Sequence, residues 1–303
     1  MNTYPKTYRS FLQWCNSNKL YGHFFMKNLF NIQLYDVTLR TIPNKQFVFY
    51  DKVQSFHEIY FNHYPQSFEI GPIKFKNNDS ISYNEINLYD YILNHQNLLK
   101  YPNKKNYISV SNIETLIQIL QEEQENIMRN FNCLSFLPTS TKIQEENMNK
   151  ILYFLSYLQN QYKCKNNTPI FKTKTNVILT EDHDFIIHKM LKYHQNNINT
   201  ICLSDPNSII NEEDFQYILT TTNYYGLPFS QIALELYLNK NEVNNEKLIK
   251  KLIHNALDYG IREFNVSLID EKNESKNKKK LNIITYELFY KFLVDYIIKK
   301  TEK

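Results

Sequence analysis

The sequence predicts a single (β/α)₈ TIM barrel, and two observations carry that prediction. From about residue 31, short β-rich runs alternate eight times with longer stretches that have apolar residues at three- and four-residue spacing, which is the pattern of βα units. The chain has 303 residues, close to the length of one such barrel. We therefore expect residues 31–300 to form the barrel and residues 1–30 to flank or plug its lower face.

The eight expected strands are short runs rich in β-branched, aromatic and aliphatic residues. They cover residues 32–38, 67–70, 107–110, 131–136, 169–172, 200–203, 231–238 and 263–268. Helical spacing follows in the segments 112–127, 145–162, 181–194, 211–222 and 244–259. Thr180 and Asn211 are expected to cap two of these helices, since their side chains can accept a backbone N–H hydrogen bond.

Composition excludes several function classes. Lys and Arg number 35 against 31 Asp and Glu, which gives a formal charge of +4, and the lysines are scattered, so we expect no nucleic-acid partner. No segment reaches the roughly 18 uninterrupted apolar residues of a membrane helix, so we expect no membrane partner. The four cysteines, Cys15, Cys133, Cys164 and Cys202, show no zinc-like spacing. We interpret them as reduced, buried thiols of a cytoplasmic protein.

Polar residues at the carboxyl ends of the expected strands are the candidates for chemistry, because active sites of this fold lie there. The first strand is followed by Arg40, the second contains Glu69, and Asp205 follows the sixth. Glu235 lies on the seventh strand, and Asn282 follows a lysine-rich loop. We expect these five side chains to converge at one end of the barrel.

Seven short motifs follow one another along the chain. They are LYDVTLR at 34–40, DKVQSF at 51–56, SFEIG at 67–71, SVSN at 109–112, CLSDPNSI at 202–209, IALELYLN at 232–239 and NIITYELFY at 282–290. Their order resembles that of the hydroxymethylglutaryl-CoA lyase group, within the pyruvate-carboxyltransferase-like, metal-dependent aldolase barrels. The resemblance spans roughly residues 31–292, and it rests on the order of the motifs along the chain.

The resemblance implies a carbon–carbon lyase that acts on an acyl-CoA-type small molecule with bound Mg²⁺ or Mn²⁺. The family holds its cation with an Asp after strand one, a His-x-His pair on strand seven and an Asn near the last helix. On the matching positions, Arg40, Glu69 and Asp205 would be catalytic, and Asn282 would be a metal ligand.

Three of the four implied metal ligands are changed in this chain. Thr41 stands in place of the Asp, Glu235 and Tyr237 stand in place of the two histidines, and the segment 270–280 replaces the family's catalytic loop. Glu235 and Asn282, with Thr41 or water, could still supply the oxygen ligands that Mg²⁺ accepts. The alternative is that Arg40 supplies the positive charge and that Glu69, Asp205 or Glu235 pairs with it. The most specific expectation is a pair with Glu235, directly or through water.

Two functions therefore stay open. The first is a lyase or aldolase of this type with an altered metal site or none. The second is a pseudoenzyme, a barrel that acts as a ligand-binding or protein-interaction module. A homodimer is one open arrangement for either, and the fold cannot decide between them because this barrel hosts many functions.

Overall fold

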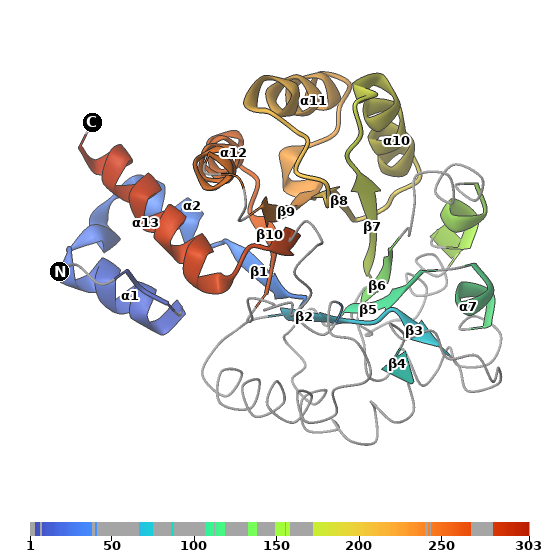
Figure 1. The fold of residues 1–303 in the computed structure, drawn as a ribbon, viewed down its shortest axis with the longest axis horizontal. Coiled ribbons are helices and arrows are strands. Elements are labelled where there is room, and N and C mark those ends of the chain that lie inside the picture. Colours follow the sequence, from blue (N-terminus) through green and yellow to red (C-terminus); the bar gives the residue numbers. More distant parts are fainter. Residues whose placement is uncertain are drawn as a thin grey trace. The chain divides into compact units, whose positions relative to one another are not determined.

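The structure is a computed structural model of the chain (Figure 1). It describes residues 4–6, 8–37, 40, 67–74, 86–87, 107–111, 113–118, 133–137, 149–154, 156–157, 172–239, 242, 244–267 and 281–302. The chain divides into two compact units. Unit 1 comprises Met1–Tyr35, Leu179–His188 and Leu203–Lys303, and unit 2 comprises Asp36–Ile178 and Lys189–Cys202. The expectation of one domain over residues 31–300 stays a prediction.

The main sheet contains nine strands. They are β1 (Gln33–Asp36), β2 (Ser67–Ile70), β5 (Tyr107–Val110), β6 (Cys133–Phe136), β7 (Lys172–Ile178), β8 (Thr200–Asp205), β9 (Ile232–Asn239), β10 (Glu263–Val266) and β11 (Leu281–Ile283). Their order in the sheet is β10-β1-β2-β5-β6-β7-β8-β9-β11, and β10 also pairs with β9. Strands β1 to β10 of this sheet therefore follow one another in chain order. Strand β10 pairs with both β1 and β9, which closes the ring of eight strands as in a (β/α)₈ barrel. The predicted fold class is confirmed.

In unit 2, strands β2, β5, β6 and β7 pair side by side and in parallel. The register places Ser109 opposite Ser135, and Ser135 opposite Lys174. A second, two-stranded sheet pairs β3 (Ile73–Lys74) with β4 (Ile86–Asn87). Helix α7 (Ile113–Gln118) follows β5, and residues 149–154 and 156–157 are helical.

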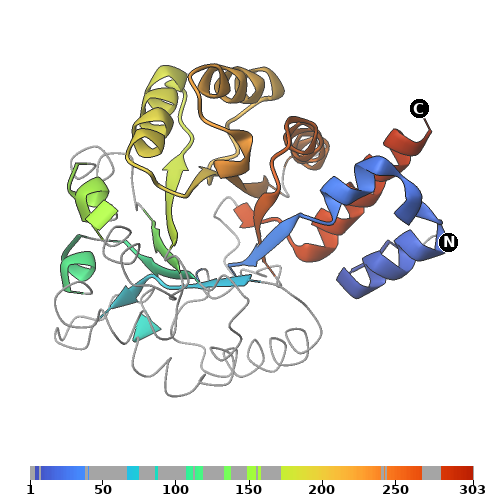
Figure 2. The ribbon, with the colours of Figure 1, turned by 180° about the vertical axis from the view of Figure 1, so that it is seen from behind.

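Unit 1 contains most of the described helices. They are α1 (Tyr8–Ser17), the 3₁₀ turn η1 (Leu20–Gly22), α2 (Phe24–Leu29), α11 (Glu212–Tyr224), the 3₁₀ turn η3 (Phe229–Gln231), α12 (Asn245–Tyr259) and α13 (Tyr286–Thr301), while α10 (His183–Gln195) belongs to both units. Helix α12 packs against β9 and lies between α11 and α13 (Figure 2). Strand β9 pairs in parallel with β10 and antiparallel with β11.

The first thirty residues contact the last helix and the start of β10. The ring of Phe11 on α1 stacks on Tyr290 of α13 at 5.6 Å between centroids. Arg262, which precedes β10, donates from Nε to the carbonyl oxygen of Asn28 at 3.0 Å. The expectation that this segment flanks the barrel's lower face stays a prediction.

The described elements confirm most of the predicted ones. Strands β2 and β5 have the predicted bounds, and Asn211 caps α11 by accepting from Asp214 N at 2.8 Å. The expected cap at Thr180 is wrong, because α10 begins at His183 and the side chain of Asp182 accepts the N–H of Phe185.

The predicted end of the fifth strand, at residue 172, is also wrong. Strand β7 continues to Ile178 through a run that alternates lysine and threonine. A run of lysine and threonine indicates an exposed loop unless a tertiary contact compensates the charge of a buried lysine. Lys174 has such a contact and is fully buried.

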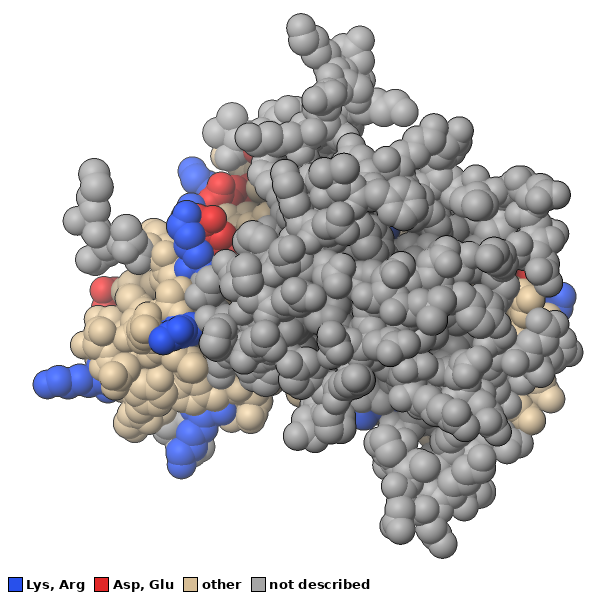
Figure 3. Space-filling view, turned by 90° about the horizontal axis from the view of Figure 1, so that it is seen from below, with Lys and Arg blue, Asp and Glu red and all other residues tan. Residues whose placement is uncertain are grey.

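The structure also bears on the expectations for the cysteines, for membrane helices and for the distribution of charge. Cys15, Cys133 and Cys202 are buried, as predicted, and Cys164 lies outside the described residues. Among the helices that the structure describes, none is long and apolar enough to cross a membrane. On the face in Figure 3, the described basic and acidic side chains lie next to one another. Ion pairs such as Lys6–Glu287 and Lys251–Glu212, both at 2.9 Å, link opposite charges elsewhere in the chain.

Candidate functional site

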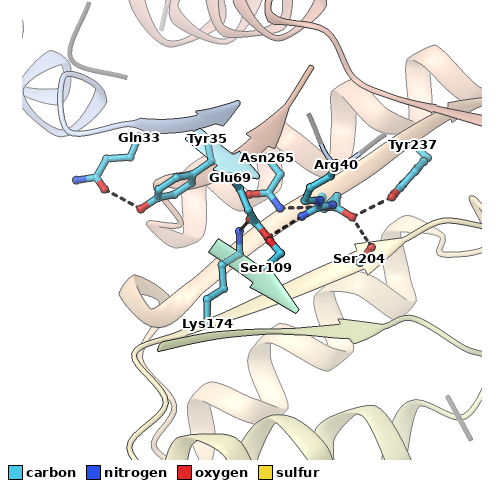
Figure 4. A network of polar contacts seen from close by, with 10 residues as sticks. Gln33, Tyr35, Arg40, Glu69, Ser109, Lys174, Ser204, Tyr237 and Asn265 are labelled. Carbon is cyan, nitrogen blue, oxygen red and sulfur yellow. Dashed lines mark hydrogen bonds and ion pairs between the residues drawn. The ribbon is translucent and has the colours of Figure 1, made fainter. Parts of the chain in front are cut away.

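Two polar clusters lie on or next to the strands, one in each unit, and Figure 4 shows both. The first, named the Glu69 cluster, contains Arg40, Glu69, Ser109 and Lys174 of unit 2. The second, named the Glu235 cluster, contains Ser204, Glu235, Tyr237 and Asn265 of unit 1. Buried polar side chains of this kind must be hydrogen-bonded, since an unpaired one costs free energy.

In the Glu69 cluster, three side chains surround one carboxylate (Figure 4). Ser109 Oγ donates to Glu69 Oε1 at 2.6 Å, and Lys174 Nζ donates to Oε2 at 2.8 Å. Arg40 Nη1 lies 3.3 Å from Oε1. The side chains of Glu69 and Lys174 are 0% exposed and that of Arg40 is 6% exposed. Lys174 Nζ also lies 5.1 Å from the ring centroid of Tyr107, within range of a cation–π contact.

These neighbours keep Glu69 ionised. Burial acts to raise the pKa of its carboxyl group, but the charges of Lys174 and Arg40 and the hydrogen bonds from Lys174 and Ser109 lower that pKa to about 2. Burial acts to lower the pKa of Lys174, and the charge of Glu69 outweighs it, so this pKa is raised. The pair is therefore a buried salt bridge with both members charged.

The pair also shows how strongly the sheet of unit 2 curves. Strands β2 and β7 are separated by β5 and β6, which in a flat sheet would place them about 14 Å apart. A lysine and a glutamate side chain approach each other to 2.8 Å across that interval. Glu69 and Lys174 therefore point to the concave face, which is the interior of a barrel.

In the Glu235 cluster, one carboxylate accepts from three neutral donors. Ser204 Oγ and Tyr237 Oη donate to Glu235 Oε1 at 2.8 and 2.9 Å, and Asn265 Nδ2 donates to Oε2 at 2.6 Å. Glu235 and Tyr237 share one face of β9 because strand side chains alternate. The β9–β10 register, with Glu263 opposite Ala233, brings Asn265 beside Glu235.

The side chain of Asp205 is hydrogen-bonded to the backbone of the turn that follows β8. Its carboxylate oxygens accept the backbone N–H groups of Ile209 at 3.0 Å and Ile210 at 3.2 Å, so it closes the turn after β8. Burial raises the pKa of this carboxyl group, and backbone hydrogen bonds partly offset the effect. In the same turn Ser208 Oγ donates to the carbonyl oxygen of Tyr237 at 2.7 Å. A catalytic role for Asp205 stays a prediction.

Asn282 lies on β11, which runs antiparallel to β9. The register places Asn282 opposite Leu238 and Ile283 opposite Tyr237. Directly opposed residues point to the same face of a sheet, so Asn282 shares a face with Leu238. Glu235 and Tyr237 point to the other face of β9. The strand pairing therefore does not direct Asn282 and Glu235 to one common point.

The described residues do not fit the divalent cation that the sequence resemblance implies. The oxygens of Glu235 already accept three hydrogen bonds from neutral groups, and donor hydrogens repel a cation. Within the described part of the chain, no group of three His, Cys, Asp or Glu side chains could hold a metal ion. Thr41 and the segment 270–280 lie outside the described residues.

Sequence reasoning found four of the clustered residues by resemblance, among them Tyr237, and missed others. Arg40 and Glu69 are brought together in unit 2, and Glu235 anchors the second cluster. Lys174 was missed because its strand reads as polar, although alternation of lysine with threonine over 172–175 is a period-two signal. Asn265 carried no signal before the β9–β10 register was known.

The expected pair between Arg40 and Glu235 would join the two units and stays a prediction. The ion pair described for Arg40 is with Glu69. The hydrogen bonds described for Glu235 come from Ser204, Tyr237 and Asn265.

Replacing Tyr237 by phenylalanine should lower the free energy of unfolding by about 1 kcal/mol, because it removes the hydroxyl that donates to the buried carboxyl group of Glu235. The measurement is urea unfolding followed by circular dichroism. Tyr224→Phe is the matched control: Tyr224 is 84% exposed, so its removal of a hydroxyl should change little. Equal effects of the two substitutions would contradict the hydrogen-bond assignment.

The likeness of this chain to known proteins is a likeness of fold and not of sequence. No protein-family model and no curated protein sequence matches this chain. Among solved structures, hydroxymethylglutaryl-CoA lyase from Pseudomonas aeruginosa is 11% identical with a TM-score of 0.54, covering 78% of this chain and 76% of that one. The HMG-CoA lyase from Brucella melitensis is 10% identical with a TM-score of 0.57, covering 89% and 99%.

A third similar structure is the carboxyl transferase domain from Rhizobium etli pyruvate carboxylase with 3-bromopyruvate. It is 9% identical with a TM-score of 0.51, and the match covers 78% of this chain and 40% of that one. Together these structures confirm the resemblance that the sequence motifs predicted, at the level of architecture. The chain has the barrel fold seen in HMG-CoA lyases and in pyruvate carboxylase carboxyltransferase domains.

Proposed function

We propose that this lyase-like barrel has lost the metal-dependent carbon–carbon lyase reaction and acts as a ligand-binding module. One observation carries the proposal. Glu235 occupies the position of the first histidine of the family's pair, and its carboxylate accepts from Ser204, Tyr237 and Asn265. Three of the roughly four lone-pair directions of this carboxylate already accept hydrogen bonds, so Mg²⁺ or Mn²⁺ would have to displace these donors to gain more than one contact with it.

The proposed ligand of this module is a small molecule with anionic groups. Arg40 and Lys174 are buried cations held by Glu69, and fixed cations in a low-dielectric site favour anionic groups. An acyl-CoA-type molecule or a related organic acid has such groups. The proposal also includes a cytoplasmic location, for which the buried cysteines are the support. It includes no nucleic-acid or membrane partner, and a homodimer is the assembly to test.

The surviving alternative is an active lyase with a rearranged metal site. It would need Glu235 to exchange its hydrogen bonds for a cation. It would also need the side chain of Asn282 on β11 to turn from the face that it shares with Leu238 to the face of Glu235. Both changes cost free energy that a weakly bound Mg²⁺ must supply. The alternative is therefore the second candidate.

Turnover and metal binding test the proposal together. The purified protein should not cleave hydroxymethylglutaryl-CoA with added Mg²⁺ or Mn²⁺, and calorimetric titration with Mn²⁺ should show no saturable one-to-one binding. An authentic HMG-CoA lyase serves as the positive control for both assays. Metal-dependent turnover that Arg40→Ala abolishes would overturn the proposal, as would stoichiometric Mn²⁺ binding that Glu235→Gln abolishes.

A further inference from the structure

Ser135 is a buried hydroxyl that the described network does not use. It lies on β6 and is 0% exposed. Among the residues that the structure describes, no hydrogen-bond partner lies within reach of its Oγ. A buried hydroxyl without a partner costs free energy, and such groups in native proteins commonly face an ordered water or a ligand.

The strand register shows what surrounds this hydroxyl. Ser135 is directly opposite Ser109 on β5 and directly opposite Lys174 on β7. Directly opposed residues of parallel strands point to the same face and lie about 4.8 Å apart. Ser109 and Lys174 both donate to Glu69, and Figure 4 shows them directed toward it. Ser135 therefore points to the same concave face as the Glu69 cluster.

The position and charge of this face favour an anion. Ser109 and Ser135 are the next-to-last residues of their strands, and the carboxyl ends of strands form the ligand-binding end of this fold. The Glu69 cluster contains two cations, Arg40 and Lys174, and one carboxylate. A hydroxyl donor beside such a cluster matches an oxyanion, which accepts a hydrogen bond and is attracted by the positive charge.

We infer that Ser135, with Lys174 and Arg40, forms a metal-independent binding site for a small oxyanion such as a carboxylate. One ligand oxygen accepts the hydrogen bond from Ser135 Oγ, and the two cations held by Glu69 supply the electrostatic attraction. The inference deepens the proposed function by naming the ligand class. It rests on that proposal for the absence of a required cation.

Two matched substitutions test the role of Ser135. Ser135→Ala and Thr175→Val each remove a fully buried hydroxyl that has no described partner. Thr175 is opposite Phe136, so it points to the other face of the sheet. Neither substitution should lower the melting temperature of the free protein, because each removes an unsatisfied group.

Calorimetric titrations with malonate and with inorganic phosphate, in buffer containing EDTA, measure binding. We expect wild type and Thr175→Val to bind at least one anion with equal affinity, and Ser135→Ala to bind about tenfold more weakly, the effect of one charge-assisted hydrogen bond. Tighter binding of malonate would identify a carboxylate ligand, and tighter binding of phosphate a phosphoryl group.

The inference is overturned if wild type binds neither anion, or if Ser135→Ala binds as tightly as wild type. The first result would leave an ordered water as the partner of Ser135. Failure of the proposed function is separately visible, because metal-dependent turnover would contradict that proposal whatever the EDTA titrations show.

Discussion

Replacing Lys174 by methionine is expected to lower the free energy of unfolding by about 3–5 kcal/mol. Lys174 and Glu69 are both fully buried and lie 2.8 Å apart. The substitution keeps most of the side-chain volume but leaves a buried carboxylate whose ion pair is now with Arg40 alone. The carboxylate loses its shorter ion pair and one hydrogen bond, and this loss is costly because water cannot replace them in a buried site. Urea unfolding followed by circular dichroism measures the effect.

Lys172→Met is the matched control on the same strand and face. Lys172 is half-buried, not fully buried, and its replacement should change stability by about 1 kcal/mol or less. The double variant Lys174→Met/Glu69→Gln should regain part of the loss, because it removes both members of the pair. A loss below about 1 kcal/mol for Lys174→Met would show that the pair contributes no more than an exposed one.

Acid should unfold the protein partly through Glu69. The pKa of this group is lowered to about 2 from an ordinary value of 4.5. Because the folded state holds the ionised form more strongly than the unfolded chain does, the stabilisation is complete above about pH 4.5. It is lost as the pH falls toward 2. The difference between 4.5 and about 2 corresponds to about 3 kcal/mol.

Unfolding free energies measured between about pH 7 and pH 2 test this prediction. In Glu69→Gln, the part of the acid dependence that Glu69 supplies should disappear. Asp205, whose pKa is raised in the folded protein, contributes in the opposite direction, and that contribution should stay. Ser109→Ala is the milder variant: it removes one hydrogen bond to the carboxylate, so the loss of stability should still begin near pH 4.5 but should be smaller and be complete at a higher pH than in the wild type. An unchanged acid profile in both variants would contradict the assignment.

The sequence determined the order of elements well. Strands β2 and β5 have their predicted bounds, because turn-flanked β-rich runs have few alternatives. The end of β7 was missed, since hydropathy treats Lys174 as a surface residue and only its pairing with Glu69 makes burial favourable. The cap at Asp182 was displaced by two residues from Thr180, because neighbouring polar residues compete as caps and local sequence does not rank them.

For the candidate site, the sequence by itself determined which residue types stand at the strand ends and that the family's histidines are replaced by Glu235 and Tyr237. Only the tertiary structure decided the partners of each carboxylate. Arg40 and Lys174 hold Glu69, whereas Glu235 accepts from neutral donors on β8, β9 and β10. The physical reason is strand register: a shift of one residue turns every side chain to the other face, and that register is set by packing between segments far apart in the chain.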